Sequence, residues 1–96
     1  MPRELERTIY LAEIMLEGSS GRRQVRITDL SLGGCFVDGI VAFSKGEGVS
    51  IELKNTEGKT MQVSGEVAWT SDGVGFGVQF VNLDPSQILF LEQMLK

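Results

Sequence analysis

The sequence predicts an all-β domain in which six antiparallel strands form a barrel and one C-terminal α-helix follows. Six short runs alternate apolar and polar residues, which is the period of strands with one buried face. Twelve glycines and only two prolines provide for many tight turns. After Asn82 the apolar period becomes helical. Strands of this number usually close into a barrel, because closure removes exposed edges.

The first two strands are expected to form a long hairpin. The first begins at Thr8 and the second covers residues 22–30, with a turn at residues 18–21 between them. The outward positions of the second strand are Arg22, Gln24 and Arg26. The inward positions of the pair are Tyr10, Ala12, Ile14, Leu16, Val25 and Ile27. The hairpin therefore carries the chain out and returns it to the end of the sheet where it began.

Four further strands are expected at residues 34–38, 49–53, 59–70 and 76–80. The third of these is the most regular, and its alternation places Trp69 on the inward face as a core or barrel-end aromatic. Gly65 in the same strand is expected to mark a bend. The loop after residue 38 carries Ile40, Val41 and Phe43, which either form a docking patch or fold over the end of the barrel.

The C-terminal helix is expected over residues 84–95. Asp84 suits the N-cap, Pro85 suits the first turn, and Gln87 completes a capping box. The apolar face comprises Ile88, Leu91 and Leu95, supported by Leu89 and Met94. We therefore expect one domain over residues 1–96, with an N-terminal arm at 1–7, a barrel at 8–81 and the helix last.

Composition excludes several classes of function. The formal net charge is −4, from nine basic and thirteen acidic residues, whereas proteins that bind DNA or RNA are usually basic. Histidine, the commonest general base and metal ligand, is absent. No nucleophile–base pair, metal cluster or cofactor loop is recognisable, so we expect neither an enzyme nor a cofactor.

The location of the protein is inferred from weaker signals. The only cysteine, Cys35, excludes an internal disulfide and suits a small buried side chain in a reducing compartment. The charged N-terminus predicts no signal peptide, and no apolar run is long enough to insert into a membrane. These features predict a cytoplasmic protein.

Two polar clusters are expected to meet at the return end of the first hairpin. Their members are Arg3, Arg7, Asp29, Ser31, Gly33 and Gly34. Guanidinium groups can grip phosphate or the edge of guanine, a carboxylate can accept the N–H donors of guanine, and glycines permit close approach. Weaker candidates for the same site are Arg26, Trp69 and Gln79. From the residues alone a simpler interpretation stays open, in which Arg7 forms a surface ion pair with Asp29 or Glu6.

The two clusters resemble the motifs of a known family. Arg3-x-x-x-Arg7, a hairpin, and then Asp29-x-Ser31-x-x-Gly34 match the RxxxR and [D/N]xSxxG motifs of the PilZ domain family in order and spacing. The segments at residues 65–69 and 75–80 also resemble later strands of that family, so the resemblance covers nearly the whole chain. It implies a PilZ-type barrel that binds the bacterial second messenger cyclic di-GMP.

The resemblance also implies a role for each motif residue. Arg3 and Arg7 would hold the guanines and phosphates from a mobile arm. Asp29 and Ser31 would contact a guanine edge and a phosphate from the barrel surface, and Gly33 with Gly34 would allow the close turn. Because Glu4 and Glu6 lie between the arginines, we expect weak binding of an anionic ligand.

A receptor of this kind would signal by coupled ordering. Ligand binding would fix the arm and create a surface for a bacterial effector protein of the motility, pilus, polysaccharide or chemotaxis machinery. One alternative is a PilZ-like adaptor that binds no nucleotide and acts only through protein contacts. Another is a small barrel that binds single-stranded nucleic acid, which the acidic charge and few aromatics disfavour.

Overall fold

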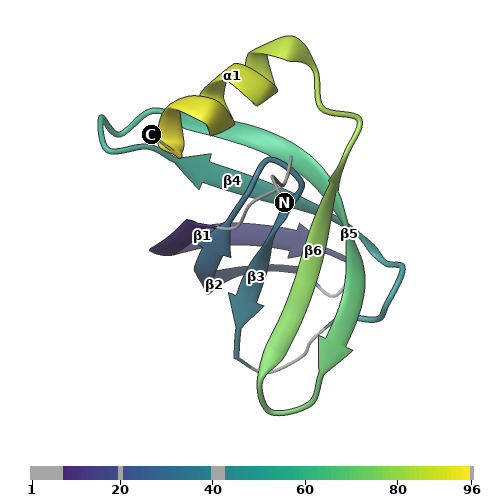
Figure 1. Ribbon diagram of the computed structural model, residues 1–96. Coiled ribbons are helices and arrows are strands. Elements are labelled where there is room, and N and C mark those ends of the chain that lie inside the picture. The colour runs from purple at the N-terminus through teal and green to yellow at the C-terminus, as the bar shows by residue number, and fades with distance from the viewer. Residues whose placement is uncertain (1–7, 20, 40–42, 96) are drawn as a thin grey trace, which may run out of the picture.

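The computed structural model describes residues 8–19, 21–39 and 43–95. Its elements are β1 (Thr8–Gly18), β2 (Gly21–Leu30), β3 (Gly34–Asp38), β4 (Gly48–Lys54), β5 (Thr60–Ser71), β6 (Gly75–Val81) and α1 (Pro85–Met94). The strands close into a barrel in the order β1-β2-β3-β6-β5-β4, and all neighbours are antiparallel. The predicted six-stranded antiparallel barrel with a C-terminal helix is therefore confirmed (Figure 1).

The core fills the barrel with the inward side chains of all six strands. Its largest fully buried members are Phe76, Leu16, Ile27, Leu30, Ile51, Leu53 and Leu91. Phe43, from the loop before β4, joins this core and packs edge-on against Phe76 with ring centroids 5.8 Å apart. The guanidinium of Arg23 lies 5.7 Å from the Phe43 ring centroid. Phe43 is thus folded into the barrel, whereas Ile40 and Val41 lie outside the described residues.

Three strand pairs, β1–β2, β2–β3 and β5–β6, contain a register shift, and the last two decide which side chains reach the outer surface near the β2–β3 turn. Between β2 and β3 the extra residue is Thr28, and Asp29 then lies opposite Phe36. Between β5 and β6 the extra residue is Ala68, and Trp69 then lies opposite Gly77. An extra residue in a strand moves every later side chain to the other face. The expectation of an inward Trp69 is therefore wrong, and its side chain is 42% exposed on the outside of the barrel.

Gly65 is needed for close packing of β5 on β6, and the bend expected at this residue stays a prediction. A Cβ atom at Gly65 would lie 2.6 Å from the Cγ1 atom of Val78, so the absence of a side chain lets β5 and β6 approach. The register shift in β5 follows two positions later, after Val67.

Helix α1 lies across one end of the barrel, over β4 and β5 (Figure 1). Asp84 and Gln87 form the expected capping box, and Pro85 occupies the first turn. The Gln87 side-chain amide also donates to the Gln62 carbonyl of β5 at 2.8 Å. Within the part of the chain that the structure describes, no helix is long and apolar enough to cross a membrane.

The buried face of α1 differs from the expected one. Leu91 is fully buried, and the half-buried side chains around it are Phe90, Met94 and Leu95. Ile88 and Leu89 are 37% and 55% exposed, so the expectation that Ile88 shares the buried face is wrong. Helical spacing puts Ile88 near Leu91, but Phe90 takes the neighbouring inward position.

Candidate ligand-binding site

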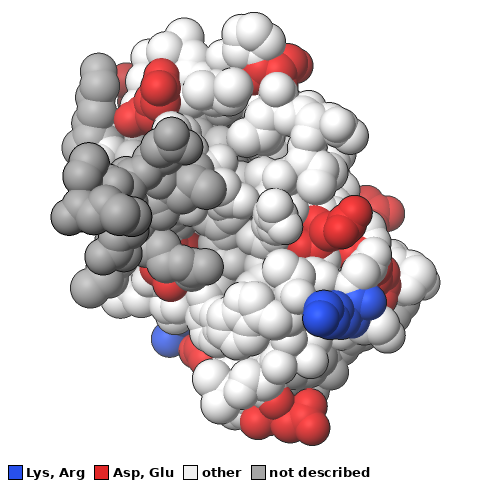
Figure 2. Space-filling model, turned by 45° about the vertical axis from the view of Figure 1, so that its right-hand side comes forward, with Lys and Arg blue, Asp and Glu red and all other residues white. Residues whose placement is uncertain are grey.

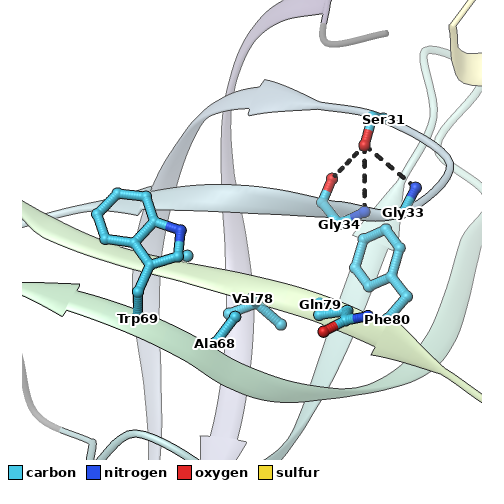
Figure 3. Close-up of a pocket in the computed structure, with 9 residues that line it drawn as sticks. Ser31, Gly33, Gly34, Ala68, Trp69, Val78, Gln79 and Phe80 are labelled. Atoms are coloured by element: carbon cyan, nitrogen blue, oxygen red, sulfur yellow. Dashed lines mark hydrogen bonds between the residues drawn. The ribbon is translucent and has the colours of Figure 1, made fainter. Parts of the chain in front are cut away.

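A groove with a volume of about 490 Å³ lies beside the turn between β2 and β3. Its lining residues are Ser31, Gly33, Gly34, Ala68, Trp69, Gly77, Val78, Gln79 and Phe80. Trp69 stands at one end of the groove, the Ser31 turn stands at the other, and β6 passes between them (Figure 3). The groove thus joins Ser31, Gly33 and Gly34 of one predicted polar cluster with two of the weaker candidates, Trp69 and Gln79.

Cross-strand pairing explains why these residues meet. Gly34 lies opposite Gln79, and two residue pairs further Phe36 lies opposite Gly77. The bulged β5 places Trp69 opposite the same Gly77. Four neighbouring strands, β2, β3, β6 and β5, therefore present one continuous outer row that begins with Asp29.

Two aromatic side chains cover β6 where it carries glycine. We call Phe36 and Trp69 the aromatic ledge: their ring centroids lie 5.3 Å apart and their planes are stacked at 28°. A Cβ atom at Gly77 would lie 2.4 Å from the Trp69 Nε1 atom, so the indole rests directly on the β6 backbone. The Phe36 ring lies similarly close to Gly75. Trp69 of the ledge lines the groove and offers an exposed aromatic ring on which a planar group could stack.

The opposite wall is the turn at residues 31–34, and glycine is needed there for close packing. Neither Gly33 nor Gly34 has a positive φ, so these glycines do not supply left-handed turn geometry. A Cβ atom at Gly34 would lie 2.0 Å from the Val78 carbonyl oxygen of β6. The Phe80 amide donates to the Gly33 carbonyl at 2.8 Å. The turn is therefore fastened directly to β6.

The Ser31 side chain stabilises this turn from inside. Its hydroxyl accepts hydrogen bonds from the Gly33 and Gly34 amides at 3.1 and 3.2 Å. The hydroxyl lies 3.3 Å from the Gly34 carbonyl, to which it donates, and the Ser31 amide donates to that carbonyl at 2.9 Å. With only 4% of its surface exposed, Ser31 is the one buried polar residue in the described part of the chain.

No charged side chain lines the groove. None of the nine lining residues is ionisable, so the charge that would hold an anion must come from neighbouring residues. Asp29 is half-buried beside Phe36 at the end of the outer row. Among the residues coloured by type in Figure 2, carboxylates form several separate groups and basic side chains form no broad patch. The described residues also contain no cluster of three His, Cys, Asp or Glu side chains that could hold a metal.

The other predicted site residues lie elsewhere. Arg26 lines a separate groove on β1, β2 and β3, between Glu13 and Asp38 on the neighbouring strands. The structure therefore does not bring Arg26 to the groove. Arg3 and Arg7 lie outside the described residues, so their predicted roles stay predictions.

Sequence reasoning missed two residues that contact Trp69. These are Phe36, which stacks on it in the ledge, and Gly77, which lies under its indole. The available signal was the Gly75-x-Gly77 alternation in the last strand, which leaves one outer face without side chains. Aromatic residues on neighbouring strands often cover such glycines. That rule could have directed attention to Phe36 and Trp69.

Comparison with known proteins agrees with this fold. The PilZ domain of CeSA from a cellulose-synthesizing bacterium superposes with a TM-score of 0.75 and 16% identity, over 94% of each chain. The Bacillus subtilis inhibitor of motility, MotI/DgrA, gives a TM-score of 0.79 with 15% identity over 99% of this chain. Borreliella burgdorferi PlzA, in a structure with c-di-GMP, gives 0.71 with 16% identity over 99% of this chain.

The extent of these matches differs. This chain spans nearly all of the CeSA domain but only 49% of the B. subtilis protein and 41% of PlzA. None of the curated proteins shows significant sequence similarity to it. The sequence model of the PilZ domain, by contrast, matches residues 2–96. The chain is therefore a member of the PilZ domain family.

Proposed function

We propose that this domain is a non-enzymatic receptor for cyclic di-GMP that passes its signal to a protein partner. PilZ domains form a family of receptors for this ligand, and both ligand motifs stand in this chain. PlzA, one of the structural neighbours, has been solved with c-di-GMP bound. The proposal includes a cytoplasmic location, because the ligand that the family resemblance implies, cyclic di-GMP, is an intracellular messenger.

The observation that carries the proposal is the groove between the Ser31 turn and Trp69. The turn belongs to the [D/N]xSxxG motif, and it lines a groove of about 490 Å³ with an aromatic wall at its other end. A guanine needs a flat surface and edge acceptors, which Trp69 and the Asp29 carboxylate could supply. The Gln79 side chain on the floor offers a further donor and acceptor.

Arg3 and Arg7 would supply the positive charge that the lining of the groove lacks. Each guanidinium can form paired hydrogen bonds to a phosphate, which are stronger than bonds between neutral groups. Holding the N-terminal arm on the ligand costs about 1–2 kcal/mol of backbone entropy per residue ordered. Because ligand contacts must offset this loss, the bound arm and the ligand would form one new surface that a partner can recognise.

The class of partner is proposed from the neighbours. One of them is an inhibitor of motility and another is a PilZ domain of a protein from a cellulose-synthesizing bacterium. We therefore propose an effector protein of the motility or polysaccharide machinery, with pilus and chemotaxis proteins as further classes that family resemblance implies.

Calorimetric titration of the full chain with cyclic di-GMP tests the proposal. We expect saturable binding, and we expect Arg7→Ala and Asp29→Ala each to weaken it ~10-fold or more, on the order of 1.5–3 kcal/mol for a charged hydrogen bond. Arg22→Ala is the matched control, because Arg22 is exposed at the far end of β2, about 20 Å from Asp29 at ~3.3 Å per residue.

The outcomes separate the candidate functions. Absence of heat at high micromolar cyclic di-GMP would contradict the receptor function and favour an adaptor that acts only through protein contacts. Unchanged affinity in both Arg7→Ala and Asp29→Ala would remove the site assignment. Tighter binding of single-stranded oligonucleotides than of cyclic di-GMP would favour a nucleic-acid-binding barrel.

A further inference from the structure

The hydroxyl of Ser31 has no hydrogen-bonding capacity left for a ligand. A serine hydroxyl has one donor proton and two acceptor lone pairs. The amides of Gly33 and Gly34 both donate to this oxygen, at 3.1 and 3.2 Å, and its own donor bond goes to the Gly34 carbonyl. The dashed lines in Figure 3 mark these three bonds, which all return to the turn itself.

Burial reinforces this assignment. The Ser31 side chain is 4% exposed, although the turn that contains it lines the groove. Turning the Ser31 side chain about χ1 to bring its oxygen to a ligand would leave the half-buried Gly33 amide and the buried Gly34 amide without their partner. Buried N–H groups in folded proteins are almost always paired, so such a rotation is strongly opposed.

The turn is also fixed from its other side. The Gly33 carbonyl accepts from the Phe80 amide, and Gly34 packs against the Val78 carbonyl with no room for a Cβ atom. Ser31 therefore closes a turn that is already joined to β6, the strand that carries Gly77 and Gln79 on the floor of the groove. The Ser31 hydroxyl and these contacts with β6 together hold the shape of one wall of the groove.

We infer that Ser31 is a positioning residue, which holds the turn in a ligand-ready shape instead of donating to a ligand phosphate. This inference rests on the proposed function and refines the direct contact that the family resemblance implies. Binding that needs a preformed wall loses affinity when the wall loosens, because the free protein must then be ordered by the ligand.

Two variants test the inference, Ser31→Ala and Ser31→Thr. The alanine variant removes the hydroxyl, and the threonine variant keeps a hydroxyl that can make the same turn bonds. Ser50→Ala is the matched control, because the Ser50 hydroxyl bonds to a side chain, the Gln62 amide oxygen, on the outside of the barrel. Each protein is studied by amide hydrogen exchange without ligand and by calorimetry with cyclic di-GMP.

For Ser31→Ala we expect at least ~10-fold faster exchange at Gly33 and Gly34, together with ~10-fold weaker binding. Ser31→Thr should restore both properties, and Ser50→Ala should change neither. Ser31→Ala that binds weakly while Gly33 and Gly34 exchange as in the native protein would overturn the inference in favour of direct contact. Faster exchange with unchanged affinity would overturn it as well, since the turn shape would then not matter for binding. The exchange measurement needs no ligand. A wrong inference about Ser31 is therefore distinguishable from a failure of cyclic di-GMP to bind the native chain.

Discussion

Gly77 lies under the Trp69 indole, and this contact connects a missing side chain to the shape of the groove. A methyl group at Gly77 would stand 2.4 Å from the Trp69 Nε1 atom and 2.7 Å from Cε2. The ring would have to lift from β6, because the backbone beneath it is held by pairing on both sides. Gly77 thus matters for the wall of the groove although it has no polar group of its own.

We predict that Gly77→Ala displaces the indole without unfolding the barrel. Trp69 is the only tryptophan in the chain, so its fluorescence reports this site alone. The emission should shift to longer wavelength as the ring gains exposure, and stability should fall by about 1–3 kcal/mol, which is typical of overpacking. Gly48→Ala is the control, because nothing lies within 4 Å of a Cβ atom at that strand position. Identical emission spectra for Gly77→Ala and the native protein would contradict the contact.

The residues of the site show what a sequence can and cannot reveal. The order and spacing of Asp29, Ser31 and Gly34 pointed to the turn that lines the groove. The sequence could not reveal that the Ser31 hydroxyl is used within the turn, because its three hydrogen bonds there depend on the detailed backbone geometry. Nor could it reveal that Gly34 is required by the Val78 carbonyl of another strand.

Two turns at the other end of the β1–β2 hairpin are joined by one carboxylate. The Glu47 side chain accepts from the Ser19 amide at 2.8 Å, from the Ser19 hydroxyl at 2.6 Å and from the Ser44 amide at 3.0 Å. The Ser19 hydroxyl bond, followed by the Ser44 and Ser19 amide bonds, lowers the pKa of Glu47 below its ordinary value. Glu47 therefore clamps the β1–β2 turn to the loop before β4.

This clamp predicts a specific pH dependence of stability. A carboxyl group whose pKa is lower in the folded state stabilises the fold above its unfolded pKa, and the effect is lost as the pH falls through the folded pKa. We expect Glu47→Gln to be less stable than the native protein at pH 7, and we expect the difference to shrink progressively below about pH 4.5. Thermal unfolding at pH 7 and at low pH measures both.

The Ser19→Ala variant and the double variant complete a cycle that isolates the pair. If the clamp is correct, the two substitutions are not additive at pH 7. A stability difference between Glu47→Gln and native protein that stays constant down to low pH would contradict the role of the Glu47 charge.

Whole elements were more predictable than the faces they present. Period-two alternation located all six strands, because one face of each is buried in a single core. The same alternation failed for Trp69, since the bulge at Ala68 has no distinct signature in composition. For α1 the capping residues fixed its start at Pro85, but the choice between Ile88 and Phe90 as buried neighbour of Leu91 depends on how the helix crosses the barrel.

The barrel as a whole separates two ends with different tasks. The β2–β3 turn and Trp69 line a groove near the end of β2, whereas the Glu47 clamp holds the opposite end of the β1–β2 hairpin. The closed order β1-β2-β3-β6-β5-β4 makes β3 and β6 neighbours, which places the turn beside Gln79. Alternation alone predicts strands and closure but not this order, because the order arises from pairings between strands distant in the chain.

The most direct test of the account is amide NMR of the full chain during titration with cyclic di-GMP. We predict that the largest changes occur at the Gly33 and Gly34 amides, at Gln79 and at the single indole N–H of Trp69, while Ser44 and Glu47 at the clamp stay unchanged. Saturating cyclic di-GMP that leaves the indole and the Gly33–Gly34 signals in place, or that moves the clamp residues instead, would contradict the proposal that this groove is the ligand site.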